Sequence, residues 1–228
     1  KISSLRQTIS TVKKRLPNNI PLIGFSGAPW TLITYLIEGG SSKDFNKTRH
    51  FLYSRKEVFK RIMSILVDAI SDFLILQAES GVDILMLFDT WASSVPESKR
   101  EQIIFKTHNQ IVNNIRSNGI NLPIISFPKG ISSDLINYSN HVEVDCIGID
   151  QITDIIKIDK LLNKNMAIQG NLDPVYLINN NLEVYDFIDK LLEISKRRPY
   201  IFNLGHGILP NSKISMVEKI ITYIRHRK

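Results

Sequence analysis

The sequence predicts an α/β fold built from parallel βα units. Three observations lead to this prediction: six short apolar runs, helical patterns between these runs, and the absence of strict apolar–polar alternation within them. Runs without alternation are typical of strands buried on both faces, as in parallel sheets. A strand followed by a helix, repeated six times, favours an open doubly wound sheet or a (β/α)8 barrel.

The predicted elements follow one another along the whole chain. The first is an amphipathic helix, because apolar residues recur at helical spacing at Ile2, Leu5, Ile9, Val12 and Leu16. The expected strands, rich in Ile, Val, Leu and Phe, cover 20–27, 82–89, 122–128, 144–150, 166–171 and 200–205. The clearest helical stripes lie in 57–79 and 97–117, and weaker ones lie near 131–140, 151–163, 182–197 and 212–227. A further short helix is expected after "GFSGAPW", since Pro29 suits a first helical turn.

Two observations favour the barrel over the open sheet. No G-x-G-x-x-G follows a strand and no G-x-x-x-x-G-K-[ST] occurs, so the nucleotide-binding sheet has no support. A complete barrel needs about 250 residues and eight units, whereas this chain has six predicted units after a lone helix. We therefore expect a (β/α)8 TIM barrel that lacks its first two βα units in this chain. Residues 1–228 are expected to form a single domain, the C-terminal part of a longer protein.

Composition excludes several classes of protein. The 228 residues are 43% apolar and 22% charged, as in ordinary globular proteins. A single cysteine excludes an internal disulfide framework and fits a reducing compartment. No stretch approaches the roughly 20 apolar residues that span a bilayer. The lysines that give the net charge of +7 are scattered, which favours a compositional cause. We expect a cytoplasmic protein that binds neither nucleic acid nor membrane.

Polar or glycine-rich sequence follows every predicted strand. In a barrel, site residues lie just beyond the carboxyl ends of the strands. The segments at those positions are "GFSGAPWTLITYLIEGG", "LFDTWASS", "SFPKG", "GIDQ", "QGNLDP" and "NLGHG". Their common placement is the main reason, from the residues alone, to expect a functional site there.

His206 is the strongest single candidate for that site. It lies between Gly205 and Gly207 in "FNLGHGILP", directly after a predicted strand. The two glycines allow other atoms to approach the backbone closely. An imidazole changes charge near neutral pH, so His206 could transfer a proton or donate to a carboxylate. The alternative is a purely structural histidine.

Tyr35, Asp89 and Thr90 are weaker candidates. Tyr35 lies in the predicted helix after "GFSGAPW", where an ordinary packed tyrosine is the alternative. Asp89 and Thr90 end a strand, and helix capping or a buried ion pair competes with catalysis at both positions. Trp30 is expected to be a packing anchor. The segment 38–45, "EGGSSKDF", is either a mobile flap or a plain surface loop.

A metal site is not expected. Zinc sites need three or four His, Cys or carboxylate ligands in workable geometry. The single cysteine and the five histidines, which lie mostly on predicted helices or loops, do not supply such a set.

Four motifs together carry a resemblance to a known family. "PLIGFSGAPWTLITYLIEGGSSKDF", "FDTW", "QGNLDP" and "FNLGHGILP", in this order, closely resemble the uroporphyrinogen decarboxylase family from about residue 20 to the end. The resemblance implies a (β/α)8 barrel, a homodimer when full length, and no metal or cofactor. It implies an enzyme that removes CO2 from the four acetate side chains of uroporphyrinogen III, giving coproporphyrinogen III. Tyr35 and His206 would then be catalytic, and Tyr35, Thr90 and His206 would contact substrate.

The sequence departs from the family pattern in places. The family's arginine motif after the first strand and its aspartate after the second are absent from this chain. "WASS" replaces a more glycine-rich sequence after "FDTW", and Gln151 stands where tryptophan is common. We therefore expect the full-length protein to be active and this 228-residue piece alone to be inactive. The alternatives are a corrinoid-dependent zinc methyltransferase of the same barrel superfamily and a non-catalytic remnant.

Overall fold

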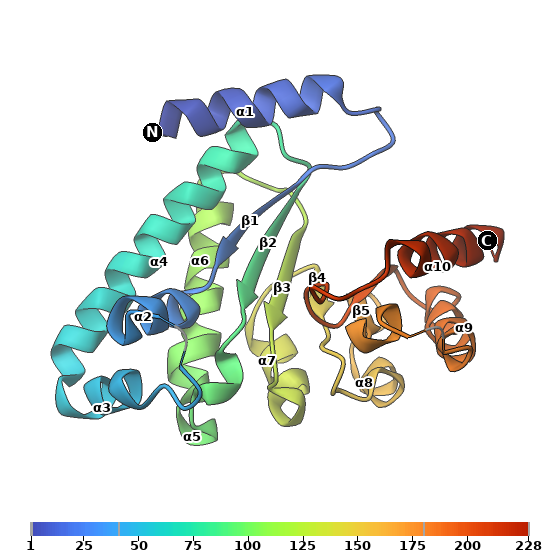
Figure 1. Ribbon diagram of the computed structural model, residues 1–228. Helices are drawn as coiled ribbons and strands as arrows, with labels where there is room; N and C mark the ends of the chain where they lie inside the picture. Colours follow the sequence, from blue (N-terminus) through green and yellow to red (C-terminus); the bar gives the residue numbers. More distant parts are fainter. Residues whose placement is uncertain (1, 41, 180, 228) are drawn as a thin grey trace. The chain divides into compact units, whose positions relative to one another are not determined.

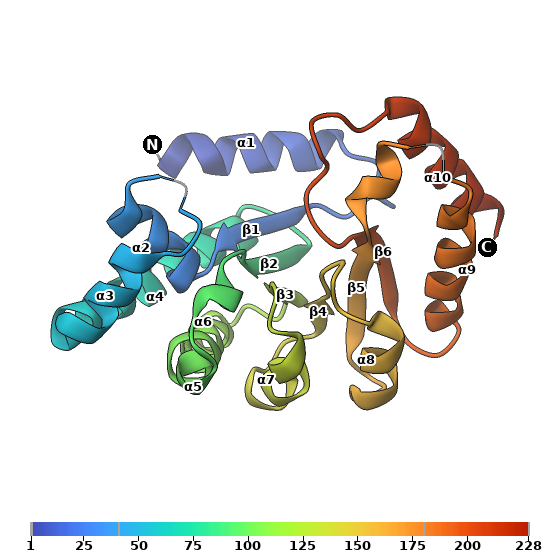
Figure 2. The same ribbon diagram turned by 60° about the horizontal axis from the view of Figure 1, so that its bottom comes forward.

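The computed structural model describes residues 2–40, 42–179 and 181–227, and its chain divides into two compact units. Unit 1 is Lys1–Asp145 and unit 2 is Cys146–Lys228. Each unit contains three parallel strands with helices between them (Figures 1 and 2). The prediction of a single domain over 1–228 stays a prediction.

In unit 1, three strands pair in chain order and helices pack on them. The elements are α1 (Ile2–Arg15), β1 (Ile23–Gly27), α2 (Pro29–Glu38), α3 (Asn46–Ser54), α4 (Lys56–Glu79), β2 (Ile84–Asp89), η1 (Ala92–Ser94), α5 (Glu97–Arg100), the π-helical η2 (Glu101–Phe105), α6 (Lys106–Ser117), β3 (Ile124–Pro128), η3 (Ser132–Asp134) and α7 (Leu135–His141). The register places Ile23 beside Ile84 and Leu85 beside Ile124. The long helices α4 and α6 run side by side along the strands (Figure 1). Their apolar stripes, which include Val67, form the core with β1–β3.

Unit 2 repeats the same arrangement on a smaller scale. Its elements are β4 (Cys146–Gly148), α8 (Ile155–Leu161), β5 (Ala167–Leu172), η4 (Pro174–Leu177), α9 (Glu183–Ser195), β6 (Tyr200–Leu204) and α10 (Ile214–His226). The strands pair in parallel, with Cys146 beside Ala167 and Ile168 beside Tyr200. Helix α9 packs against β5 and β6 (Figure 2).

All six predicted strands and all the predicted helices are present, which confirms the strand–helix alternation expected from the sequence. Helix α3 is an addition, because its short sequence "NKTRHFLYS" has no long apolar stripe. The predicted helix 97–117 consists of α5, η2 and α6 in succession.

The expectation that every strand is buried on both faces is wrong for β1 and β6. Side chains along a strand point alternately to its two faces. In β1 the residues alternate between exposed and buried, and Phe25 is 58% exposed. In β6 they alternate between half-buried and exposed. Strands β3, β4 and β5 have mainly buried residues along their whole length.

No described helix combines the length and the apolar character that crossing a bilayer requires.

Asp83 ties α1 to the start of β1 in unit 1. Its carboxylate accepts a hydrogen bond of 2.7 Å from the Leu22 backbone N–H. It also forms an ion pair with the Lys13 ammonium, whose Nζ lies 2.5 Å from Oδ2. The Leu22 N–H, with a further contribution from Lys13, holds the pKa of Asp83 below its ordinary value.

Asp83→Asn should therefore destabilise the protein at neutral pH. Because the folded pKa is depressed, the contribution of Asp83 is complete above its unfolded pKa of about 4 and is lost as pH falls through the folded pKa. The difference in urea midpoint between wild type and Asp83→Asn should be clear at pH 7 and should shrink as the medium is acidified. Asp68→Asn, an exposed change on α4, is the control. A pH-independent difference would contradict this account.

Candidate functional site

Trp30 fixes the beginning of α2 against the segment that follows β2. Its side chain is completely buried, and its Nε1 donates to the Trp91 carbonyl and to the Ser94 Oγ, each at 3.0 Å. The prediction that Trp30 is a packing anchor is confirmed. The start of α2 and the turn after β2 are therefore held at a set distance from each other.

Thr31 makes a second and more polar link between the same two segments. Its Oγ1 donates to Asp89 Oδ1 at 2.6 Å and accepts from the Trp91 backbone N–H at 3.3 Å. Thr31 and Asp89 are both buried. One hydroxyl thus satisfies a buried carboxylate and orients the turn that carries Thr90.

The other oxygen of Asp89 enters a buried chain of polar groups. His108 Nε2 lies 3.3 Å from Asp89 Oδ2, and His108 Nδ1 lies 2.9 Å from the Tyr138 hydroxyl. The Tyr138 hydroxyl in turn lies 2.6 Å from Ser126 Oγ. One assignment of donors satisfies every group: Ser126 donates to Tyr138, Tyr138 to His108 Nδ1, and His108 Nε2 to Asp89.

Burial raises the pKa of Tyr138 above its ordinary value, and the negative charge of Asp89 adds to the rise, while the Ser126 hydrogen bond opposes it. The phenol therefore keeps its proton and remains a donor. Capping, a buried ion pair and catalysis were the alternatives for Asp89. The structure shows Asp89 buried and paired with the buried His108.

Tyr35 lies one helical turn beyond Thr31, so the two side chains are on the same face of α2. It is 49% exposed and meets the Trp91 ring edge-on, with 6.5 Å between the ring centroids. The half-buried Thr90 immediately precedes Trp91. The structure therefore places Tyr35 beside the turn that carries Thr90. The buried Asp89 and His108 lie beneath this turn.

The segment 38–45 is anchored at its end beside this turn. Phe45 is buried and packs on the Trp91 ring with 4.9 Å between centroids, and Glu38 accepts hydrogen bonds of 2.9 Å from the N–H and hydroxyl of Thr48. Ser41, within the segment predicted as a flap or a surface loop, lies outside the described residues. Flap motion stays a prediction.

His206 follows β6 in unit 2, and its two glycine neighbours have different surroundings. A Cβ on the buried Gly205 would fall 2.7 Å from the Gln151 Cα and closer still to the Gln151 backbone nitrogen. A Cβ on Gly207 would meet nothing within 4 Å. Gly205 thus allows β6 to approach the segment after β4. His206 itself is exposed, and its Nδ1 accepts from the Gly207 N–H at 2.5 Å.

Polar residues also meet at the carboxyl ends of β4 and β5. Asn171 is 2% exposed, and its amide donates at 2.8 Å to the carbonyls of Asp150 and Thr153. Asp173 accepts from the Val175 N–H at 2.9 Å and begins η4. These residues build the turn, and with Gln151 they line a hollow of about 390 Å³ in unit 2.

Tyr35 and Thr90 belong to unit 1 and His206 belongs to unit 2. The meeting of all three in one pocket stays a prediction. Among the residues described here, no three His, Cys, Asp or Glu side chains are grouped as metal ligands would be.

Gly205→Ala should destabilise the protein, because the new methyl group would overlap backbone atoms of Gln151. We expect a loss of about 1–3 kcal/mol, as for overpacking in a dense interior, measured as a lower urea midpoint at constant slope. Gly207→Ala is the matched control and should change stability by less than about 0.5 kcal/mol. Equal effects at the two glycines would show that close packing is not the reason for Gly205.

Tyr138→Phe should also be costly, since it leaves His108 Nδ1 and Ser126 Oγ buried without their shared partner. The expected loss is about 1–3 kcal/mol, measured by the same unfolding curves. Tyr185→Phe, which removes a hydroxyl from a half-buried ring in unit 2, should have little effect. A Tyr138→Phe protein as stable as wild type would mean that the polar chain contributes no net stability.

Comparisons with known proteins identify the family to which the chain belongs. The model of the uroporphyrinogen decarboxylase (URO-D) family matches residues 1–227, so the similarity begins well before residue 20. Proteins named uroporphyrinogen decarboxylase from Maricaulis maris (strain MCS10) and Rickettsia bellii (strain RML369-C) are 37% and 35% identical over 226 and 225 residues. These alignments cover 99% of this chain and 66% of each relative, so the chain spans about two thirds of their length.

A solved structure, a methyltransferase from Methanosarcina mazei, matches with a TM-score of 0.75 over 97% of this chain and 63% of its own, at 13% identity. This likeness concerns the fold alone, and it confirms the predicted α/β class, a partial (β/α) barrel. Together with the strand-end motifs around Tyr35, Thr90 and His206, the family match over nearly the whole chain establishes that the chain belongs to the uroporphyrinogen decarboxylase family.

Proposed function

We propose that the protein carrying this chain is a uroporphyrinogen decarboxylase, which converts uroporphyrinogen III to coproporphyrinogen III in porphyrin and haem biosynthesis. The observation that carries the proposal is the turn at 89–91, where Tyr35 packs on Trp91, the residue after Thr90, in a chain that matches the family over residues 1–227.

Each decarboxylation consumes one proton and releases one CO2. A ring carbon of the pyrrole is first protonated, which makes the ring an electron acceptor. The bond between the acetate methylene and its carboxylate then breaks, and its electron pair enters the ring as CO2 leaves. A proton added to the resulting exocyclic carbon, with loss of the ring proton, gives a methyl group. The substrate itself accepts the electrons, so the reaction needs positioning, proton transfer and stabilisation of positive charge.

The proposed roles follow from the side-chain chemistry at each position. The Tyr35 and Thr90 hydroxyls would donate to substrate carboxylates, and Thr31, Asp89 and Trp91 would hold that pair in place. His206 would donate to a carboxylate or to a neighbouring proton donor. The exposure of Tyr35 and His206 supports these roles, because both side chains can be reached from solvent.

The remaining features of the proposal come from the family resemblance. We place the protein in the cytoplasm, as a homodimer when full length, with neither nucleic acid nor a membrane as partner. Its only cysteine, the buried Cys146, supports a reducing compartment.

Substitutions at the three proposed residues test this function in the natural full-length protein. The wild-type enzyme should convert uroporphyrinogen III to coproporphyrinogen III. Chromatography of the oxidised porphyrins measures this conversion. Tyr35→Phe and His206→Ala should lower kcat/KM by about 10- to 100-fold, because a hydrogen bond to a charged group contributes about 1.5–3 kcal/mol. Thr90→Val should have a similar effect, whereas Thr90→Ser, which keeps the hydroxyl, should remain near wild type.

Two control variants separate loss of chemistry from loss of folding. Tyr185→Phe and the exposed His50→Ala change the same residue types elsewhere and should retain activity. If wild type releases no CO2 from uroporphyrinogen III, the decarboxylase proposal is wrong. If wild type is active and the Tyr35, Thr90 and His206 variants are equally active, only the residue assignment is wrong.

A further inference from the structure

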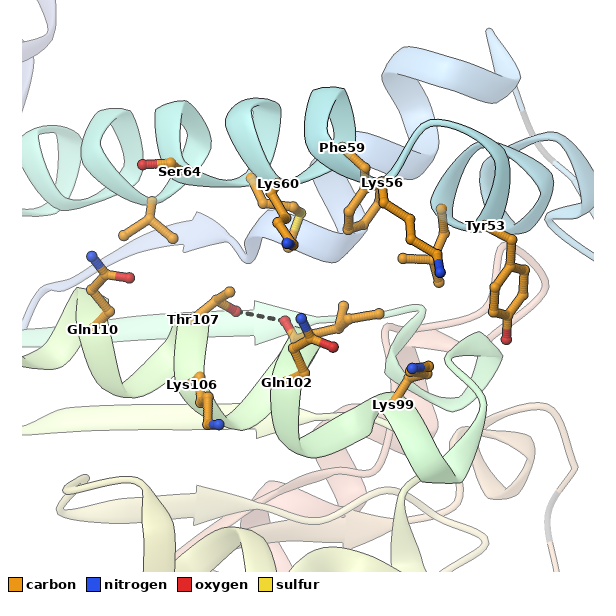
Figure 3. A pocket seen from close by; sticks show the side chains of 14 residues that line it. Tyr53, Lys56, Phe59, Lys60, Ser64, Lys99, Gln102, Lys106, Thr107 and Gln110 are labelled. Carbon is orange, nitrogen blue, oxygen red and sulfur yellow. Dashed lines mark hydrogen bonds between the residues drawn. The ribbon is translucent and has the colours of Figure 1, made fainter.

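A groove lies between helices of unit 1 and shares no lining residue with the Tyr35–Thr90 turn. It runs between α4 with the end of α3 on one side and the α5–η2–α6 segment on the other, and it encloses about 400 Å³ (Figure 3). Phe59, Met63 and Ile103 form its apolar floor, and each of them is at most 5% exposed. The volume lies within the range of about 300–1,000 Å³ that is typical of small-molecule sites.

Four lysines line this groove, and none of its lining residues is acidic. Lys60 pairs with Glu57 at 2.9 Å, and Lys106 lies 3.6 Å from Glu101. Within the described ranges, no acidic side chain pairs with the ammonium group of Lys56 or Lys99. Figure 3 shows these two lysines at one end of the groove, reaching toward it from opposite walls. That end therefore carries uncompensated positive charge.

The wall opposite α4 has an unusual backbone. Residues Glu101–Phe105 form a π-helical turn between α5 and α6. Such turns are rare inside α-helices and are frequent at functional sites. The Thr107 hydroxyl donates to the Ile103 carbonyl at 2.7 Å and to the Ile104 carbonyl at 3.2 Å. These hydrogen bonds stabilise the π turn at Ile103, whose side chain forms part of the groove floor.

We propose that this groove binds a small anionic amphiphile, with a carboxylate between Lys56 and Lys99 and an apolar body against Leu52 and Tyr53, above the buried floor. Charge complementarity specifies the head group, because unpaired ammonium groups face the groove at one end only. The apolar lining specifies the body, because the half-buried Leu52 and the 50% exposed Tyr53 offer apolar surface that gains free energy when a ligand covers it. The groove does not include Tyr35 or Thr90, and this inference does not depend on the decarboxylase proposal.

Decanoate is the probe for this site, with decanol and acetate as matched comparators. Calorimetric titration should show saturable binding of one decanoate per chain and binding at least ten-fold weaker for decanol and acetate. With ¹³C-methyl methionine labels, the Met63 resonance should shift on saturation, while that of Met216, in α10 of unit 2, should stay in place. Equal binding of decanol, or an unmoved Met63 resonance, would overturn the proposal.

Charge variants test the head-group position. Lys56→Gln/Lys99→Gln should weaken decanoate binding at least ten-fold, and Lys56→Arg/Lys99→Arg should restore it. Lys47→Gln/Lys164→Gln removes two exposed lysines outside the groove and should leave binding unchanged. Circular dichroism confirms that each variant is folded. Unchanged affinity in the glutamine pair, or an equal loss in the control pair, would show that no specific head-group site exists.

Discussion

The Thr31 hydroxyl joins the start of α2 to the turn that ends β2, and the arrangement of unit 1 at its strand ends depends on this link. Asp89 is completely buried, and a buried carboxylate is costly unless hydrogen bonds replace its hydration. Thr31 and His108 provide those bonds, at 2.6 and 3.3 Å. Satisfying the carboxylate therefore also sets where α2 begins, and with it the position of Tyr35.

The Thr31 hydrogen bonds also restrict Thr90, the second candidate residue at a strand end. Thr31 accepts from the Trp91 N–H while it donates to Asp89, so the residue between them, Thr90, has little freedom to move. The Trp91 ring then lies between Tyr35 and Phe45. The half-exposed Tyr35 is thus supported by aromatic packing on Trp91 and, beneath it, by buried polar groups.

The sequence was sufficient for the features that depend on local pattern. Unbroken apolar runs identified the strands, and Pro29 and Trp30 marked the start and the anchor of α2. The glycine at 205 suggested close approach of backbones, which the contact with Gln151 explains. His108 and Tyr138 had no such signal, because they occupy ordinary helical positions and their roles arise only when distant segments pack. Helix α3 was missed because its short sequence has no long apolar stripe.

Unit 1 thus handles charge in two physically different ways. At the strand ends, the buried Asp89 is bound at short range by the Thr31 hydroxyl and the His108 imidazole. In the groove, Lys56 and Lys99 sit at the edge of solvent above an apolar floor. Dissolved salt screens exposed charges far more than buried ones. Ionic strength therefore acts on the groove and leaves the buried chain almost untouched, so the two features can be varied independently in one protein.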